Sequence, residues 1–127
     1  MKNMASLEET IKENFRYGIT DMLILKLLTE EDKYVYQITR DLEEKSNGVF
    51  KVSKVSLYIP LNRMAQRHFV EEYKMPIKGG RYRKYYRITE TGRNYLNFME
   101  KEYRALHKST LQIMRGGTET PPRGKAN

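Results

Sequence analysis

Residues 69–92, FVEEYKMPIKGGRYRKYYRITETG, contain the pattern that decides the fold. Apolar and polar side chains alternate with a period of two over residues 69–75 and again over residues 83–88, which predicts two strands. The intervening segment, PIKGG, is rich in turn-forming residues. We therefore predict a β-hairpin, followed by a helix that begins near Thr89 or Thr91.

The second strand of this hairpin combines positive charge with aromatic rings. Residues 81–88 hold three arginines, one lysine and three tyrosines. A period of two puts four of them on one face of the strand: Arg81, Arg83, Tyr85 and Arg87. The opposite face receives Tyr82, Lys84, Tyr86 and Ile88. We expect Tyr86 and Ile88 to pack on helices while the arginine face meets the phosphates of a nucleic acid. An exposed hairpin with solvated arginines is the alternative.

Three helices are predicted upstream of the hairpin, from apolar residues spaced by three and four. They cover residues 8–28, 35–45 and about 53–67, with a connector over residues 29–34. Gly18 is a place where the first helix could bend or break, and Asn47 and Gly48 would end the second in left-handed backbone. Ser53 is expected to cap the third helix and Pro60 to bend it. The expected inward-facing residues are Val35, Ile38, Thr39 and Leu42 in the second helix, and Leu57, Leu61 and Met64 in the third.

A long helix is predicted after the hairpin. Its apolar side chains step by three and four residues, which is the heptad spacing of paired helices: Leu96, Met99, Tyr103, Leu106, Thr110 and Ile113. We expect Leu96, Met99, Tyr103, Leu106 and Ile113 to form a homodimer interface. A seam that folds back onto its own domain is the alternative. Residues 115–127 lack apolar side chains that could anchor them, so we expect a disordered tail.

This order of elements predicts a mainly α fold with a small β-hairpin, namely a winged helix-turn-helix plus a long C-terminal dimerisation helix. We assign residues 1–88 to the DNA-binding domain with its N-terminal helix, and residues 89–114 to the dimerisation helix. In this fold the third helix enters the DNA major groove, and the hairpin, or wing, reaches toward the neighbouring backbone or minor groove.

The charge distribution favours a polyanionic partner. The net charge is +8 over 127 residues. Residues 1–50 hold 7 Lys or Arg against 10 Asp or Glu, whereas residues 51–127 hold 17 against 6. A field polarised in this way attracts nucleic acid. A solvated basic surface without a partner is the alternative.

The candidate DNA contacts lie on the third helix and the wing. The helix offers short polar and amide side chains that can read base edges, together with phosphate-binding charge: Ser53, Lys54, Ser56, Asn62, Arg63 and Gln66. The glycine-rich wing tip lets basic residues approach DNA closely, and the wing candidates are Lys78, Arg81, Arg83 and Lys84. A winged-helix module for a protein partner or structured RNA is the second hypothesis. A protein-docking surface should be more apolar, and shape-driven RNA binding needs no helix that reads base edges.

Other classes of protein find little support. The chain has no cysteine, and its two histidines, His68 and His107, have no metal-site spacing. No P-loop, Rossmann or nucleophile-elbow pattern is present, so we expect no enzyme, no cofactor and no metal. The N-terminus does not read as a signal peptide, and the longest apolar run, residues 22–25, is too short to span a bilayer. We expect a cytoplasmic protein that does not bind membranes.

Two motifs resemble a known family. KVSLYIPLNRMAQRHFVEEY, residues 54–73, followed by GGRYRKYYRITETG, residues 79–92, is similar to the PadR family of bacterial transcriptional regulators. The resemblance covers roughly residues 17–107 and extends to the short subfamily, which includes multidrug-sensing repressors. The family has a Leu-Tyr pair in its third helix, here Leu57 and Tyr58, which adds Tyr58 to the expected DNA contacts. Its proline often follows that tyrosine directly, whereas here Ile59 intervenes.

The resemblance also implies how the protein would assemble and be controlled. It implies a homodimeric repressor on a palindromic operator, with the dimer built from the last helix with help from the first. In drug-sensing relatives an aromatic residue on the last helix lines a cavity at the dimer interface. The corresponding ligand candidates are Phe15, Met99 and Tyr103, and the ligand would be a small aromatic or cationic molecule. Ordinary interface packing is the alternative for these three side chains.

Overall fold

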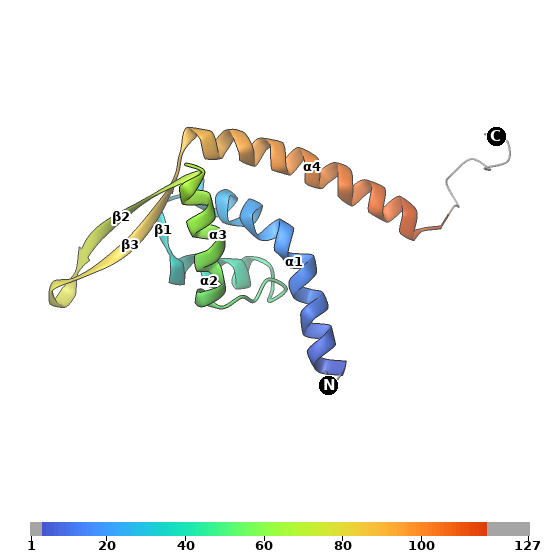
Figure 1. Ribbon diagram of the computed structural model, residues 1–127, viewed down its shortest axis with the longest axis horizontal. Coiled ribbons are helices and arrows are strands. Elements are labelled where there is room, and N and C mark those ends of the chain that lie inside the picture. The colour runs from blue at the N-terminus through green and yellow to red at the C-terminus, as the bar shows by residue number, and fades with distance from the viewer. Residues whose placement is uncertain (1–3, 117–127) are drawn as a thin grey trace. The chain divides into compact units, whose positions relative to one another are not determined.

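Three helices precede a two-stranded hairpin, and a fourth helix follows it, in the computed structural model, which describes residues 4–116 (Figure 1). The elements in order are α1 (Met4–Leu28), β1 (Lys33–Tyr34), α2 (Val35–Lys45), α3 (Lys54–Gln66), β2 (Val70–Ile77), the 3₁₀ turn η1 (Lys78–Gly80), β3 (Arg81–Ile88) and α4 (Glu90–Met114). The chain divides into two compact units between Leu96 and Asn97. The first unit has the predicted mainly α winged-helix architecture, and the predicted long C-terminal helix is confirmed.

The core of the first unit comes from α1, α2, α3 and the hairpin. The second half of α1 contributes Ile24, Leu25, Leu27 and Leu28. The predicted inward residues of α2 and α3 are buried as well, apart from Thr39, which is half-buried and hydrogen-bonds to the Val35 carbonyl at 2.9 Å. Each large apolar side chain buried in this way stabilises the unit by about 1.5–3 kcal/mol.

The predicted ends of α2 and α3 are confirmed. After α2 the backbone turns left-handed at Asn47 (φ 54°) and Gly48 (φ 87°), which is the conformation that asparagine and glycine tolerate best. The Ser53 hydroxyl caps α3 by accepting the Ser56 N–H at 3.2 Å. By contrast, α1 is one unbroken helix through Gly18, so the break considered there is not found.

The wing is longer than predicted. Pro76 and Ile77, expected in a loop, belong to β2 and pair with Tyr82 and Arg81 of β3. Proline is tolerated there because β2 is an edge strand in the sheet order β1-β3-β2. Figure 1 shows the hairpin projecting from the three helices, with its turn at the far end. Only η1 forms that turn, with Gly79 at φ 78° and Gly80 at φ 70°.

The strand β1 was not predicted. Its two residues lie in the segment interpreted as a connector, and they pair with Tyr85 and Tyr86 of β3. Lys33 is almost fully buried, and its ammonium group contacts the Asp41 carboxylate at 2.8 Å and that of Glu31 at 3.4 Å. Burial lowers the pKa of Lys33, but the two carboxylates outweigh that effect and raise it. The contact with Asp41 holds β1 against α2.

Thr89 and Gly92 fix where α4 begins. The Thr89 hydroxyl accepts the Gly92 N–H at 3.0 Å and lies 2.6 Å from the His68 carbonyl oxygen, to which it donates. A Cβ atom on Gly92 would lie 2.2 Å from the Phe69 carbonyl oxygen. Only glycine therefore lets α4 start this close to β2, as expected for a helix beginning near Thr89.

The first turns of α4 belong to the winged-helix unit. Leu96 is buried there, with 6% of its surface exposed. The predicted domain boundary after residue 88 stays a prediction. Most of the tail predicted for residues 115–127 lies outside the described residues, which end at Gly116.

Candidate nucleic-acid interface

The exposed side of α3 carries most of the predicted contacts. Leu57, Leu61 and Met64 turn inward, because residues three and four apart share one face of a helix. The rest of the helix is left to solvent, and the predicted residues exposed on it or at its cap are Ser53, Lys54, Ser56, Tyr58, Asn62 and Gln66. These polar side chains are accessible to a partner, as are the exposed apolar side chains of Val55 and Ile59.

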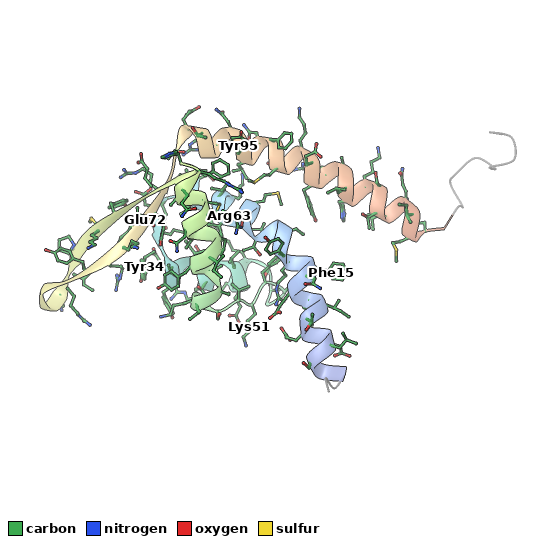
Figure 2. The ribbon with its side chains drawn as sticks, in the orientation of Figure 1. Phe15, Tyr34, Lys51, Arg63, Glu72 and Tyr95 are labelled. Atoms are coloured by element: carbon green, nitrogen blue, oxygen red, sulfur yellow. The ribbon has the colours of Figure 1, made fainter. Side chains whose placement is uncertain are left out.

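Arg63 differs from the other predicted contacts on α3. One of its terminal nitrogens lies 2.8 and 2.7 Å from the two carboxylate oxygens of Asp21 on α1. The hydrogen bond to Asp21 raises the pKa of Arg63. The side chain is only 27% exposed, and Figure 2 places it on α3. Arg63 thus joins two helices of the core, a role that the sequence pattern did not indicate.

The basic residues of the wing fall into two groups. Lys78 and Arg81 are exposed at the turn, next to the two glycines. Arg83 and Lys84 lie closer to the helices. The guanidinium carbon of Arg83 lies 4.1 Å from the centre of the Tyr34 ring, and the Lys84 ammonium lies 3.5 Å from a carboxylate oxygen of Glu72. The side chains at the turn are free to follow a DNA backbone. Arg83 and Lys84, at the base of the wing, already contact other residues of the protein.

A row of tyrosines crosses the three strands at the base of the wing. Tyr34 lies opposite Tyr85, and Tyr85 lies opposite Tyr73, so one tyrosine of each strand stands on the same face. The ring centres of these neighbours are 5.4 and 5.7 Å apart. Arginine side chains lie over two of these rings, Arg83 over Tyr34 and Arg87 over Tyr73. Such aromatic and cation–π contacts stiffen the wing where it leaves the helices.

Asp32, which precedes β1, links the row of tyrosines to this segment of the chain. It accepts the Tyr73 hydroxyl at 2.5 Å and lies 3.3 Å from the Arg87 guanidinium. The hydrogen bond to Asp32 raises the pKa of Tyr73. Arg87 also lies 3.9 Å from Glu71, so its charge is compensated within the protein. Sequence reasoning missed Asp32 and Tyr34, because a two-residue strand leaves no detectable period.

A basic hollow of about 600 Å³ opens where α2, α3 and β3 meet. It is lined by Tyr34, Val35, Tyr36, Lys54, Tyr58, Arg83, Lys84 and Tyr86. Its lining therefore includes three basic side chains and four tyrosines. Burial raises the pKa of Tyr86 to about 12, with smaller effects from Glu72 and Tyr58. The Tyr86 hydroxyl is buried without a hydrogen-bond partner, an arrangement that costs about 1–3 kcal/mol.

A second hollow, of about 460 Å³, lies between α1 and α3. Three acidic and three basic side chains line it: Glu9, Glu13, Asp21, Arg16, Lys51 and Arg63. Two ion pairs form among them, Arg16 with Glu9 at 3.6 Å and Arg63 with Asp21 at 2.7 Å. Because acidic and basic side chains are equal in number here, this hollow is less favourable for a polyanion than the basic hollow.

The predicted interface residues do not share one environment. Leu96 is already covered by its own unit, whereas Tyr103 is 37%, Leu106 65% and Ile113 76% exposed. Met99 is half-buried. On α1, Leu7, Ile11 and Phe15 form a second exposed apolar stripe with a spacing of four residues (Figure 2 labels Phe15). Phe15 and the pair Met99 and Tyr103 belong to different units, so the predicted ligand cavity stays a prediction.

Neither a metal cluster nor a membrane-spanning helix is found among residues 4–116. No group of three or more His, Asp or Glu side chains in this range could hold a metal ion. Within the same range, no helix is both long enough and apolar enough to cross a membrane.

Known proteins share this sequence and this fold. The model of the "Transcriptional regulator PadR-like family" matches residues 24–97. A Lysinibacillus sphaericus protein named "Uncharacterized protein X" is 30% identical over 109 residues, which cover 86% of this chain and 99% of that protein. A solved transcriptional regulator from Clostridium thermocellum has a TM-score of 0.73 and 26% identity, covering 78% of this chain and 96% of its own. A PadR family transcription regulator from Clostridium difficile has a TM-score of 0.65 and 29% identity, covering 75% and 97%. The chain belongs to the PadR-like family of transcriptional regulators.

Proposed function

We propose that this protein is a homodimeric repressor that binds a palindromic operator in double-stranded DNA. The observation that supports this most directly is the pairing of an exposed polar α3 with a basic wing in one unit. Side chains of α3 such as Asn62 suit base edges in the major groove. The free basic residues at the wing tip, Lys78 and Arg81, suit the phosphate backbone. The repressor role rests on the resemblance to short PadR regulators, and the cytoplasmic location is carried over from the sequence expectation.

The homodimer is supported by two apolar stripes that the chain itself leaves exposed. One runs along α4 through Tyr103, Leu106 and Ile113, and the other along α1 through Leu7, Ile11 and Phe15. Burying one such large side chain in an interface gains about 1.5–3 kcal/mol. We assign the interface to residues 89–114 with help from α1, and DNA binding to residues 1–88. Leu96 is left out of the contact surface because its own unit covers it.

Release by a small molecule is the further part of the proposal. Phe15 lies on α1, and Met99 and Tyr103 lie on α4, the two helices that we assign to the dimer interface. Aromatic and thioether side chains suit a flat aromatic or cationic ligand. Titration calorimetry with planar cations tests this idea, and a panel without any binding would leave the three side chains as interface packing.

The experiment that tests DNA binding begins with selection from a random duplex pool. Selected duplexes are compared with scrambled duplexes of the same length by fluorescence anisotropy at a fixed salt concentration. We expect two related half-sites about 34 Å apart, one helical turn, and at least a thousandfold preference for the selected duplex. A failure to enrich any sequence, together with tight binding of structured RNA, would favour the RNA-binding alternative instead.

A further inference from the structure

The basic hollow has a feature that is explained neither by base recognition through α3 nor by phosphate contacts at the wing tip. It lies at the junction of three elements, with Lys54 from α3, Lys84 from β3 and Tyr36 from α2 in its lining. Tyr86 lines it too, and its hydroxyl has no hydrogen-bond partner although the residue is fully buried. Buried polar groups are nearly always paired, so this hydroxyl calls for a partner that the free protein does not supply.

We propose that the basic hollow seats one DNA backbone phosphate per protomer, held by the ammonium groups of Lys54 and Lys84 and by the hydroxyl of Tyr86. The proposal rests on the proposed DNA-binding function and adds to it a fixed anchoring point. Two cations and a neutral donor from two different elements match the charge and the several acceptor oxygens of a phosphodiester. The three groups therefore complement a single anion rather than a base edge.

The start of α2 adds to the positive potential of this hollow. Val35 and Tyr36 are the first residues of α2 and line the hollow. Backbone N–H groups in the first turn of a helix lack partners within the helix, and the helix dipole is positive at this end. The Gln37 side chain accepts a hydrogen bond from the Tyr34 N–H at 3.1 Å, so the Tyr34 N–H itself is not open to an anion. An anion in the hollow is thus favoured by α2 as well as by the two lysines.

A phosphate reaches the Tyr86 hydroxyl only if a flexible neighbour moves. Lys84 and Tyr58 both line the hollow, and they are 47% and 45% exposed. The 3.5 Å contact between Lys84 and Glu72 is a partly exposed ion pair, which contributes little stability. An incoming phosphate would have to draw Lys84 away from Glu72, which is paired with Tyr86 across the two strands. Tyr86 keeps its proton throughout the physiological range, because its pKa lies near 12.

The anchor would set how the wing and α3 meet DNA relative to each other. Lys54 is the first residue of α3, and Lys84 lies on the strand that leads from the wing to the core. One phosphate gripped by both fixes the depth of α3 in the groove. Arg83 also lines the hollow, where its guanidinium lies over the Tyr34 ring.

The first experiment compares Tyr86→Phe with Lys84→Gln on the selected and the scrambled duplex. Tyr86→Phe removes one oxygen and no charge, so affinity should fall about tenfold or more on both duplexes, because hydrogen bonds to charged groups are strong and a phosphate carries no sequence information. Its slope of log K against log salt should stay that of the wild type. Lys84→Gln should flatten that slope by about 0.9 for each phosphate that the lysine no longer neutralises. Tyr95→Phe, which removes a phenol hydroxyl outside the hollow, is the matched control and should bind as the wild type.

The second experiment locates the phosphate. Phosphates of the selected duplex are ethylated one at a time, and binding by the wild type and by Tyr86→Phe is compared. One position in each half-site should weaken the wild type strongly and the variant much less. Thermal melting of Tyr86→Phe should show unchanged or higher stability, because a buried unpaired hydroxyl has been removed.

The outcomes separate the two proposals. Wild-type affinity from Tyr86→Phe on both duplexes, or ethylation effects that are the same in both proteins, would overturn the anchor while leaving DNA binding intact. A melting temperature clearly below that of the wild type, with unchanged DNA affinity, would assign the hydroxyl to an internal water and also overturn the anchor. A wild type that binds neither duplex would overturn the proposed function, and the anchor with it.

Discussion

A guanidinium nitrogen of Arg63 lies within 2.8 Å of both carboxylate oxygens of Asp21, and this contact joins α3 to α1. Both side chains are partly buried, at 27% and 17% exposure, so water screens the pair less than it would on the surface. Its position between two core helices makes Arg63 a structural residue in the free protein, unlike the exposed arginine at the wing tip.

Asp21→Ala should lower the free energy of unfolding by about 1–3 kcal/mol, because it leaves a partly buried guanidinium without its partner. Urea denaturation at neutral pH measures this change. The matched control is Glu100→Ala, which breaks the exposed pair of Arg104 and Glu100 on α4 and should cost less than about 0.5 kcal/mol. Equal losses from the two variants would show that the Asp21 contact is no stronger than a surface ion pair.

Gly92→Ala should destabilise the protein by about 3 kcal/mol or more, as severe overpacking does. The added Cβ would lie 2.2 Å from the Phe69 carbonyl oxygen and 2.9 Å from a side-chain carbon of Ile88. Gly18→Ala is the control, because no atom lies within 4 Å of its Cβ position on helix α1. That change should stabilise by about 0.5–1 kcal/mol. Thermal unfolding should show a lower melting temperature than the wild type for Gly92→Ala and a higher one for Gly18→Ala.

The elements that sequence reasoning placed correctly are those with a period that the fold uses directly. The apolar spacing in α2 and α3 identified Val35, Ile38, Leu57, Leu61 and Met64 as inward-facing, and all five are buried. Alternation along β3 also separated the buried Tyr86 and Ile88 from the arginine face. A period is visible in one sequence because it depends only on residues close together in the chain.

The features that were missed depend on contacts between distant residues. Arg63 was interpreted as a DNA contact, but its partner Asp21 lies 42 positions away. The strand β1 has only two residues and exists because β3 offers it a free edge. Pro76 suggested a loop, yet an edge strand accommodates it. None of these could be read from local pattern, and the role of each DNA-contact residue stays a prediction.

Tyr86→Phe should remove part of the loss of stability at high pH. A tyrosine whose pKa is higher in the folded state, here about 12, holds its proton more tightly there than in the unfolded chain, where the pKa is about 10. The part of the free energy of unfolding that comes from this tighter proton binding is complete below pH 10. It is lost as the pH rises from 10 toward 12. Denaturation at pH 8 and pH 11.5 should therefore show a smaller fall for Tyr86→Phe than for the wild type. Equal falls would mean that the Tyr86 ring is not protected from ionisation.

Leu106→Glu should abolish the homodimer. Leu106 is 65% exposed in the single chain and lies on the apolar stripe of α4, so a dimer would have to bury the new carboxylate at a cost of several kcal/mol. Sedimentation equilibrium at micromolar concentration measures the change. Lys108→Glu, on the opposite side of α4, introduces the same group and should leave the dimer intact. A wild type that sediments as a monomer would remove the dimer from the proposed function.

The wing and α3 should make distinguishable contributions to DNA binding. Arg81 is exposed beside the turn, and Arg83 lies on the same face of β3. If both bind phosphates, the double change Arg81→Ala with Arg83→Ala should flatten the slope of log K against log salt by about 0.9 for each phosphate no longer neutralised, hence by about 3–4 for two wings. Selected and scrambled duplexes should weaken alike, because phosphates carry no sequence information.

Asn62→Ala on α3 should behave in the opposite way, with an unchanged salt slope and a loss of about 1–3 kcal/mol that is confined to particular base pairs. Arg93→Ala, on the first turn of α4, is the control for charge alone and should keep the wild-type slope. Anisotropy titrations at several salt concentrations measure all three variants on both duplexes. A double variant that keeps its full salt slope would show that the wing arginines are solvated rather than bound to DNA. The protein would then bind its operator without a contribution from the two wing arginines.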